Sequence, residues 1–290
     1  MTGGWLSRLF GPRRTAPAPL TLPEHPQKGK PMSKYQLDLS KEFAGKRALI
    51  TGGSRGIGAG VAQRLIDAGA TVVVTARNTH AETPKDAIFI AGDTRTLEGA
   101  QKVAKEAIEK LGGLDLLVNS AGAAKVILPA STAIPDDQWV DSININFLAA
   151  LRITYAVLPE LLKTKGSIVN VTSGGRIAFG GPMAHYGAAK AALNNWSEAL
   201  AKEVAPQGVR VNIVSPGPII TPGGDEVRNT ITSAMGITDE QFFATVPLEG
   251  RAGQVEDLAE GIVFLLSPRA SYITGDNLYI AGGWGTLSAM

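Results

Sequence analysis

Two residues four positions apart form a pair that can move a proton. Tyr186 and Lys190 occupy positions i and i+4 of the sequence Y-G-A-A-K, so on a helix both side chains lie on one face. A free phenol has a pKa of about 10, which is too high for efficient acid-base chemistry at neutral pH. A neighbouring ammonium group stabilises the phenolate and lowers that pKa. We therefore predict a proton-transfer pair, although the same spacing occurs on solvated helix faces of unrelated proteins.

A serine precedes this pair by thirteen residues and follows the apolar run S-I-V-N-V-T at 167–172. A hydroxyl at the end of a strand can donate a hydrogen bond to a substrate oxygen and hold it beside the phenol. We predict that Ser173 orients the substrate, and that Ser173, Tyr186 and Lys190 act together.

A glycine-rich turn, T-G-G-S-R-G-I-G at 51–58, follows a strand-like run and opens a helical pattern. Gly52, Gly56 and Gly58 permit a tight turn and close approach of the backbone, and the free N–H groups of a helix N-terminus bind phosphate oxygens. The spacing G-x-x-x-G-x-G differs from the general dinucleotide pattern G-x-G-x-x-G. The turn predicts a pyrophosphate site, and a turn that only reverses the chain is the alternative.

The end of the second predicted strand bears on the choice of coenzyme. It reads V-V-V-T-A-R-N, with Arg77 and no acid to accept hydrogen bonds from the ribose hydroxyls of NAD. Arg77 and Arg55 can instead pair with a 2′-phosphate through charge-assisted hydrogen bonds. We predict NADP(H) as the preferred cofactor, with NAD(H) possible. The alternative is that both guanidinium groups only face solvent.

The elements that must position these residues alternate between short β-branched runs and amphipathic stretches. Strands are expected near 46–51, 71–75, 88–91, 114–119, 167–172, 209–215 and 277–281, and helices at 57–68, 97–111, 137–164, 187–205 and 255–266. This alternation is typical of βαβ units. We predict an α/β fold: a Rossmann-type, doubly wound, seven-stranded parallel sheet in a single domain with helices on both faces, whose ligands bind at the carboxyl ends of the strands.

Composition narrows the class of protein. The 290 residues are 44% hydrophobic and 19% charged, which suits one compact enzyme domain, predicted at 35–290. Beyond residue 34 the chain holds 22 basic and 25 acidic residues, so it lacks the excess of positive charge that binds nucleic acid. The chain has no cysteine, and its three histidines show no metal-ligand spacing. We expect no metal site and no nucleic-acid partner.

The first 34 residues differ from the rest. They carry six Lys/Arg against one acid, and prolines recur along them, so neither a helix nor a strand can propagate far. We predict a disordered basic extension. Its start weakly resembles an organelle-targeting segment or a surface-binding arm, whereas a plain tail or a true start at Met32 is the simpler interpretation. Because no apolar run approaches the roughly 18 residues of a membrane span, we expect a cytoplasmic protein without a transmembrane segment.

The motifs T-G-x-x-x-G-x-G and Y-x-x-x-K, in this order with Ser173 between them, resemble the short-chain dehydrogenase/reductase family, in the branch similar to 3-oxoacyl-[acyl-carrier-protein] reductases. The resemblance covers the chain after about residue 40. It implies that Asn146 supports a water relay behind the lysine, with Asn144 as the nearest competitor, and that Asp93 binds the adenine amino group. Asn119-Ser120-Ala121-Gly122 resembles the family motif N-N-A-G, with Ser120 in place of the second Asn. The implied cofactor-binding residues are Gly52, Ser54, Arg55, Gly56, Ile57, Gly58, Arg77, Asp93, Asn119, Ala121, Gly122, Tyr186, Lys190, Pro216, Gly217, Ile219 and Thr221.

The resemblance also implies an activity and an assembly. It implies hydride transfer between a nicotinamide and a carbonyl or secondary alcohol, and a homotetramer or homodimer acting on a small molecule. A non-catalytic NADP(H)-sensing protein, a sugar-nucleotide epimerase and a structural subunit are the alternatives. We expect residues 223–250 to form a mobile substrate lid. Candidate pocket residues, each equally able to pack in the core, are Phe179, Met183, His185, Met235, Phe242 and Phe243.

Overall fold

The computed structural model describes residues 39–174 and 181–285, and the chain from Leu39 onward forms one compact unit. The predicted basic extension at 1–34 and the candidate pocket residue Phe179 lie outside the described residues, so both expectations stay predictions.

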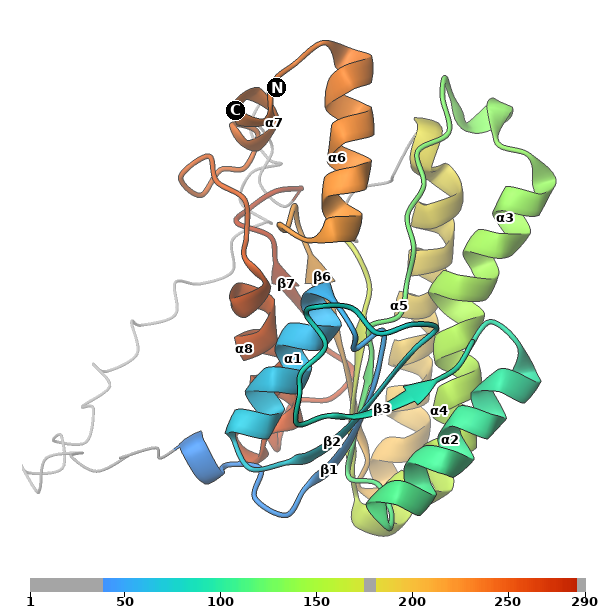
Figure 1. Ribbon diagram of the computed structural model, residues 1–290, viewed down its shortest axis with the longest axis vertical. Coiled ribbons are helices and arrows are strands. Elements are labelled where there is room, and N and C mark those ends of the chain that lie inside the picture. The colour runs from blue at the N-terminus through green and yellow to red at the C-terminus, as the bar shows by residue number, and fades with distance from the viewer. Residues whose placement is uncertain (1–38, 175–180, 286–290) are drawn as a thin grey trace, which may run out of the picture. The chain divides into compact units, whose positions relative to one another are not determined.

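A seven-stranded parallel sheet forms the centre of this unit (Figure 1). Its strands are β1 (Arg47–Thr51), β2 (Thr71–Ala76), β3 (Ile88–Ala91), β4 (Leu116–Asn119), β5 (Ser167–Val171), β6 (Arg210–Pro216) and β7 (Asn277–Ile280), in the spatial order β3-β2-β1-β4-β5-β6-β7. The predicted strands lie within about two residues of these bounds, because a parallel strand covered on both faces reads as an uninterrupted apolar run. The doubly wound α/β fold is confirmed.

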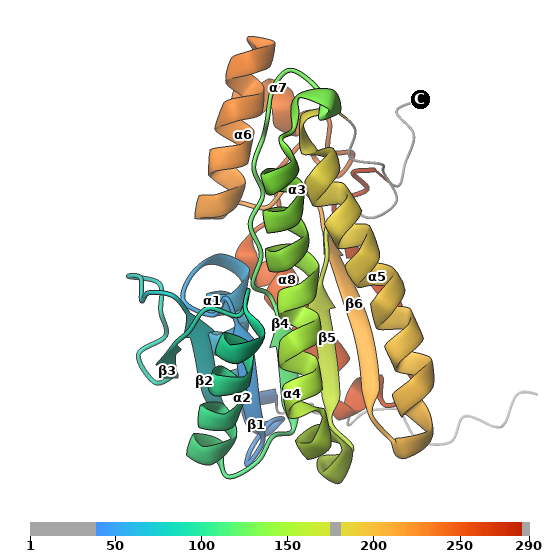
Figure 2. The same ribbon diagram turned by 90° about the vertical axis from the view of Figure 1, so that its right-hand side faces the viewer.

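Helices cover both faces of the sheet (Figure 2). They are α1 (Gly56–Asp67), α2 (Leu97–Leu111), α3 (Asp136–Ile143), α4 (Ala149–Thr164), α5 (Ala184–Val204), α6 (Pro222–Met235), α7 (Asp239–Phe243) and α8 (Val255–Leu266). Short 3₁₀ turns occur at Leu39–Lys41, Ser131–Ala133, Gly181–Met183, Ala205–Gln207 and Pro268–Ala270.

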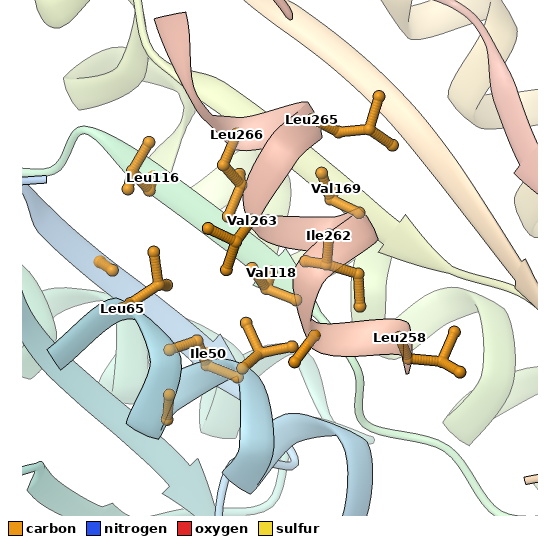
Figure 3. Packing of buried hydrophobic residues seen from close by; sticks show 14 of the residues in the cluster. Ile50, Leu65, Leu116, Val118, Val169, Leu258, Ile262, Val263, Leu265 and Leu266 are labelled. Atoms are coloured by element: carbon orange, nitrogen blue, oxygen red, sulfur yellow. The ribbon is translucent and has the colours of Figure 1, made fainter. Parts of the chain in front are cut away.

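The core has two halves, one on each face of the sheet. On one face Ile50 of β1 packs with Leu65 of α1 and Ile262 of α8 (Figure 3). On the other face Leu49, the residue before Ile50 in β1, packs with residues of α2, α4 and α5 such as Ile153. Adjacent strand residues therefore serve opposite layers, as the period of two requires.

The strand order reverses direction between β1 and β4, which are neighbours in the sheet. From β1 the chain builds outward through β2 and β3, and from β4 it builds the other way through β5, β6 and β7. The loops after β1 and β4 separate at this point, and in open α/β sheets the crevice between them binds ligands. This topology places the glycine-rich turn beside the loop after β4.

The predicted helix at 137–164 is interrupted by a π-helical segment, Asn144–Leu148, between α3 and α4. Among the described residues, only this combined helix, Asp136–Thr164, has the length and composition to cross a membrane. Its apolar residues have another explanation, because Ile153, Val157 and Leu161 are fully buried against the sheet layer that α2 and α5 also cover. The long helix is thus a core element of this fold.

The predicted lid at 223–250 contains helices that the sequence analysis did not expect. Thr221 caps the start of α6 by accepting a hydrogen bond from the Gly224 N–H, and α6 ends at Gly236 in the left-handed conformation. A capping box at Thr238 and Gln241 starts α7. These are ordinary start and stop signals of helices, so this segment is helical where a variable loop is expected from the sequence.

Candidate active site

A cleft of about 890 Å³ opens at the carboxyl ends of the strands. Its lining includes every predicted catalytic and cofactor-binding residue except Asn119. These residues come from segments as far apart in the chain as the turn after β1 and the loop after β6. A volume of this size is typical of ligand-binding clefts, so the fold brings the predicted residues together around one cavity.

Tyr186 and Lys190 lie in the first two turns of α5, and Ser173 follows β5. The Ser173 side chain hydrogen-bonds the Tyr186 side chain. The Lys190 Nζ is 6.0 Å from the centroid of the Tyr186 ring and donates a 2.9 Å hydrogen bond to the Val171 carbonyl. The three side chains therefore meet between one helix and the end of one strand.

Burial dominates the electrostatics of this pair. It raises the pKa of the Tyr186 phenol, and the hydrogen bond with Ser173 offsets the rise only in part. Lys190 is 6% exposed, and burial lowers the pKa of its ammonium to about 8. We expected the lysine to lower the pKa of the phenol. The pKa of the phenol is instead raised, because loss of solvent outweighs the hydrogen bond with Ser173, while the Lys190 ammonium donates to the Val171 carbonyl.

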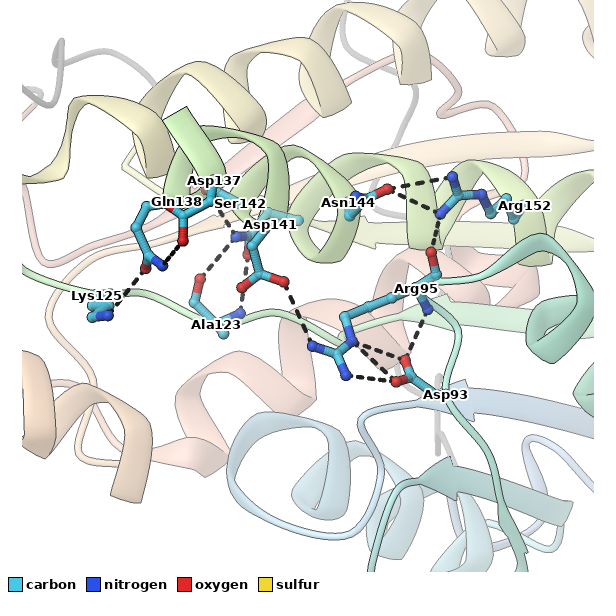
Figure 4. A network of polar contacts seen from close by, with 11 residues as sticks. Asp93, Arg95, Ala123, Lys125, Asp137, Gln138, Asp141, Ser142, Asn144 and Arg152 are labelled. Atoms are coloured by element: carbon cyan, nitrogen blue, oxygen red, sulfur yellow. Dashed lines mark hydrogen bonds and ion pairs between the residues drawn. The ribbon is translucent and has the colours of Figure 1, made fainter. Parts of the chain in front are cut away.

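Asn146 lies in the π-helical segment and is 1% exposed. Its amide makes two hydrogen bonds with the backbone of Ala123, accepting from the N–H at 3.1 Å and donating to the carbonyl at 2.8 Å. Asn144 instead bonds Arg152 and does not line the cleft (Figure 4). A Cβ added to Gly122 would lie 3.0 Å from Asn146 Oδ1 and 3.3 Å from Lys190 Nζ, so the asparagine and the lysine flank the same glycine.

The glycine-rich turn connects β1 to α1 in close contact with the loop after β4. Gly52 has a φ of +67°, and a Cβ there would lie 2.8 Å from the Ala121 Cα. A Cβ on Gly58 would lie 2.3 Å from the Gly52 carbonyl oxygen. A side chain at either position is therefore excluded. A dinucleotide fits this site, because the turn carries no side chains at Gly52 and Gly58, α1 begins beside it and the cleft is large enough. The buried hydroxyl of Thr75, which has no hydrogen-bond partner among the described residues, also borders the cleft.

Comparisons with known proteins agree with this geometry. The model of the family described as enoyl-(acyl carrier protein) reductase matches residues 52–285. The 3-oxoacyl-[acyl-carrier-protein] reductase FabG of Vibrio harveyi is 36% identical over 252 residues, covering 82% of this chain and 97% of that protein. This chain belongs to the short-chain dehydrogenase/reductase family.

Two further relatives support the assignment. The uncharacterized oxidoreductase YhxC of Bacillus subtilis is 31% identical over 283 residues, covering 91% of this chain and 96% of that protein. The crystal structure of Cj0485 dehydrogenase superposes with a TM-score of 0.79 at 29% identity, covering 87% of this chain and 98% of that one. The protein is thus an oxidoreductase of a family that binds nicotinamide cofactors.

On the side of the cleft formed by β2 and β3, this short-chain dehydrogenase/reductase presents cations. Arg55 and Arg77 are both exposed, and neither forms an ion pair with another of the residues at 39–174 and 181–285. The Asp93 carboxylate is bonded by the Arg95 guanidinium at 2.7 Å, and this bond lowers the pKa of Asp93 (Figure 4). Arg95 also lies 3.5 Å from Asp141 of α3. Asp93 borders the cleft as predicted, but as one member of this charged network.

Asn119 departs from the expectation that it binds cofactor, since it is 2% exposed and its side chain points into the interior. Its amide donates to Thr154 of α4 at 2.9 Å and to Asn170 of β5 at 2.8 Å. Asn170 in turn donates to Ser197 of α5 at 2.7 Å. The side chain of Asn119 therefore ties the sheet to two helices and does not border the cleft.

The far end of the cleft is mainly apolar. Of the candidate pocket residues, Met183, Phe242 and Phe243 line it, whereas Met235 is 65% exposed and His185 is buried, and neither lines the cleft. Burial lowers the pKa of His185. The lining at this end also includes residues that the sequence did not indicate, among them Pro182, Glu226, Val227, Arg228, Ile231 and Trp284. Recognition of α6 from its caps would have placed one helical face at the cleft.

Proposed function

We propose that this protein is an NADP(H)-dependent oxidoreductase that interconverts a ketone or aldehyde carbonyl and a secondary alcohol. The observation that carries the proposal is the meeting of Ser173, Tyr186 and Lys190 on the same cleft as the glycine-rich turn. A phenol, a hydroxyl and an ammonium beside a dinucleotide cradle supply a proton donor, an orienting group and a positive charge.

The residues that would hold the cofactor run along the cleft. The glycine-rich turn and the start of α1 would bind the pyrophosphate, Arg55 and Arg77 the adenosine ribose phosphate, and the loop at 216–221 the nicotinamide end. When bound, the nicotinamide supplies or accepts the hydride.

Tyr186 would donate its proton to the carbonyl oxygen as negative charge develops there, and would take a proton back in the oxidative direction. The phenol holds its proton at neutral pH, and the transfer is downhill because the alkoxide that hydride addition produces is a stronger base than a phenolate. Ser173, already bonded to the phenol, would donate a hydrogen bond to the same substrate oxygen. The two hydroxyl groups thus define where that oxygen lies.

Lys190 and Asn146 would support the proton donor. The ammonium of Lys190 is held at the Val171 carbonyl and remains mostly charged below its pKa of about 8. As the family resemblance implies, it would bind the nicotinamide ribose. Asn146 holds the backbone of Ala123 and thereby the strand-end loop beside the ammonium. We propose it as the residue that would also position a relay water.

Replacing Arg77 by Asp tests the cofactor preference. An aspartate there removes a cation and adds a charge that repels a 2′-phosphate, so we expect kcat/KM with NADPH to fall about 10- to 100-fold while kcat/KM with NADH holds or rises. Steady-state kinetics with both cofactors measure the ratio. Lys85→Asp is the matched control, because Lys85 is exposed in the same loop and does not line the cleft. An unchanged ratio in Arg77→Asp would rule out Arg77 as a determinant.

A carbonyl panel with NADPH tests the reaction class. The panel holds 3-oxoacyl thioesters, quinones, ketosteroids, sugars and small diketones, and loss of NADPH absorbance reports turnover. The mainly apolar end of the cleft, with Met183, Phe242 and Phe243, favours the members with an apolar body. Lack of turnover with the whole panel, in both directions, would contradict the proposal.

We also propose a homotetramer, or at least a homodimer, in the cytoplasm. An aromatic cluster supports self-association, since Trp196 of α5 packs edge-on against Tyr155 of α4 and Phe147 of the π-helical segment, and Tyr155 is 52% exposed. Sedimentation of the wild-type chain measures the assembly, and a monomer at micromolar concentration would contradict it.

A further inference from the structure

The loop between β2 and β3 folds back over the glycine-rich turn (Figure 1). In place of a crossover helix, eleven residues, 77–87, connect the two strands. Three of their side chains contact the turn. His80 Nδ1 hydrogen-bonds Ser54 Oγ at 2.9 Å, Thr83 Oγ1 donates to the Ser54 carbonyl at 3.0 Å, and Glu82 Oε2 accepts from the Gly56 N–H at 2.7 Å.

The contact of Glu82 differs in kind from the other two. Gly56 is the first residue of α1, so its N–H is one of the groups that the helix itself leaves unpaired and that carry the positive end of the helix dipole. In the proposed function this end of α1 receives the pyrophosphate. A carboxylate of this chain already holds a place that a phosphate oxygen would take.

A carboxylate and a pyrophosphate cannot share this position without repulsion between like charges. The distance of 2.7 Å leaves no room for a phosphate oxygen between Glu82 and the Gly56 N–H. Glu82 is exposed, so its side chain has solvent to move into when it is displaced. Cofactor binding therefore exchanges one anion for another at the start of α1.

We propose that Glu82 sets the affinity of this enzyme for its dinucleotide by competing with the pyrophosphate for the N-terminus of α1. This inference rests on the proposed function. While it accepts from the Gly56 N–H, the Glu82 carboxylate satisfies the helix end and fastens the 77–87 loop, and the measured affinity for cofactor is reduced by the fraction of molecules in which Glu82 occupies the site. A nucleoside such as adenosine, which has no phosphate, does not compete with Glu82.

Glu82→Gln tests the proposal, because the amide keeps the length of the side chain and removes its charge. Binding of NADPH, ADP and adenosine to the full chain is measured by titration calorimetry. We expect Glu82→Gln to bind NADPH and ADP about three- to tenfold more tightly than wild type, with adenosine unchanged. Asp86→Asn is the matched control, since Asp86 is exposed in the same loop and forms no ion pair among the described residues. It should leave all three affinities unchanged.

A second measurement does not depend on the variant. Hydrogen exchange of the amides at 77–87 in wild type should speed up when ADP binds and not when adenosine binds, because the loop loses its fastening at Gly56. Equal or weaker binding of ADP by Glu82→Gln, or unchanged exchange in the loop, would overturn the role of Glu82. If wild type and Glu82→Gln bind NADPH with the same measurable affinity, the role of Glu82 is wrong and the proposed function stands. If neither protein binds NADPH, the proposed function is wrong as well.

Discussion

Replacing Tyr186 by Phe is expected to lower kcat for carbonyl reduction by about 10²- to 10⁴-fold while NADPH binding stays within about threefold. The substitution removes one oxygen, the one bonded to Ser173, and leaves the ring in its place at the start of α5. Stopped-flow and steady-state kinetics on the best substrate of the panel measure the first quantity, and calorimetry measures the second.

The control for this variant is Tyr272→Phe, since Tyr272 is fully exposed and does not line the cleft. It should retain the kcat of wild type. Near-full turnover by Tyr186→Phe would show that the phenol is not the proton donor. Loss of NADPH binding in that variant would instead place Tyr186 in the cofactor site alone.

Replacing Lys190 by Met is expected to lower kcat/KM by about 10²-fold or more and, in the same protein, to raise the free energy of unfolding. A pKa lowered from 10.5 to about 8 means that burying this ammonium destabilises the folded protein by on the order of 3 kcal/mol at neutral pH. The unpaired Val171 carbonyl offsets about 1 kcal/mol of the gain. Urea unfolding of the cofactor-free protein near neutral pH should therefore show the variant to be more stable by about 2 kcal/mol. A less stable variant would contradict the burial argument.

The same pKa predicts a pH dependence with a definite sign. Between about pH 8 and 10.5 the unfolded chain holds a proton on Lys190 that the folded chain has lost, so the stability of wild type rises with pH in this window. The stability advantage of Lys190→Met should fall by about 2 kcal/mol between about pH 7 and 9.5, and so nearly vanish. Measurements stay at or below pH 9.5, and the contribution of Tyr186, whose pKa is raised on folding, is common to wild type and variant and cancels in their difference. An advantage that does not change with pH would show that the lysine titrates normally.

These two variants distinguish the contribution of a side chain to activity from its contribution to the stability of the fold. The burial of the Lys190 ammonium destabilises the folded chain, and the pKa of the Tyr186 phenol is raised, so stability explains neither side chain. Both become useful once a substrate oxygen lies beside them. Stability and activity of the Lys190 variant are therefore expected to change in opposite directions.

Local sequence predicted the fold and, apart from Asn119, candidate site residues that line one cleft. Runs such as V-V-V-T at 72–75 alternate with amphipathic stretches, and this alternation alone predicts a parallel sheet with helices on both faces. Glycine at 52 and 58 and the spacing of Tyr186 and Lys190 are local features, because they depend on the backbone of one turn and one helix face. They predicted a cofactor end and an acid-base pair, and both sets of residues line one cleft.

Tertiary structure alone decided the environment of these groups. Asn119 is the last residue of β4 and directly precedes residues of the cleft, but its side chain turns inward because Thr154 and Asn170, distant in sequence, offer hydrogen bonds there. The pKa of Tyr186 rises because burial depends on what packs around it, which spacing does not encode. Glu82 meets the start of α1 only because β2 and β1 are neighbours in the sheet. The direction of a side chain, its burial and its charged partners are long-range properties, since each depends on which segments fold against one another.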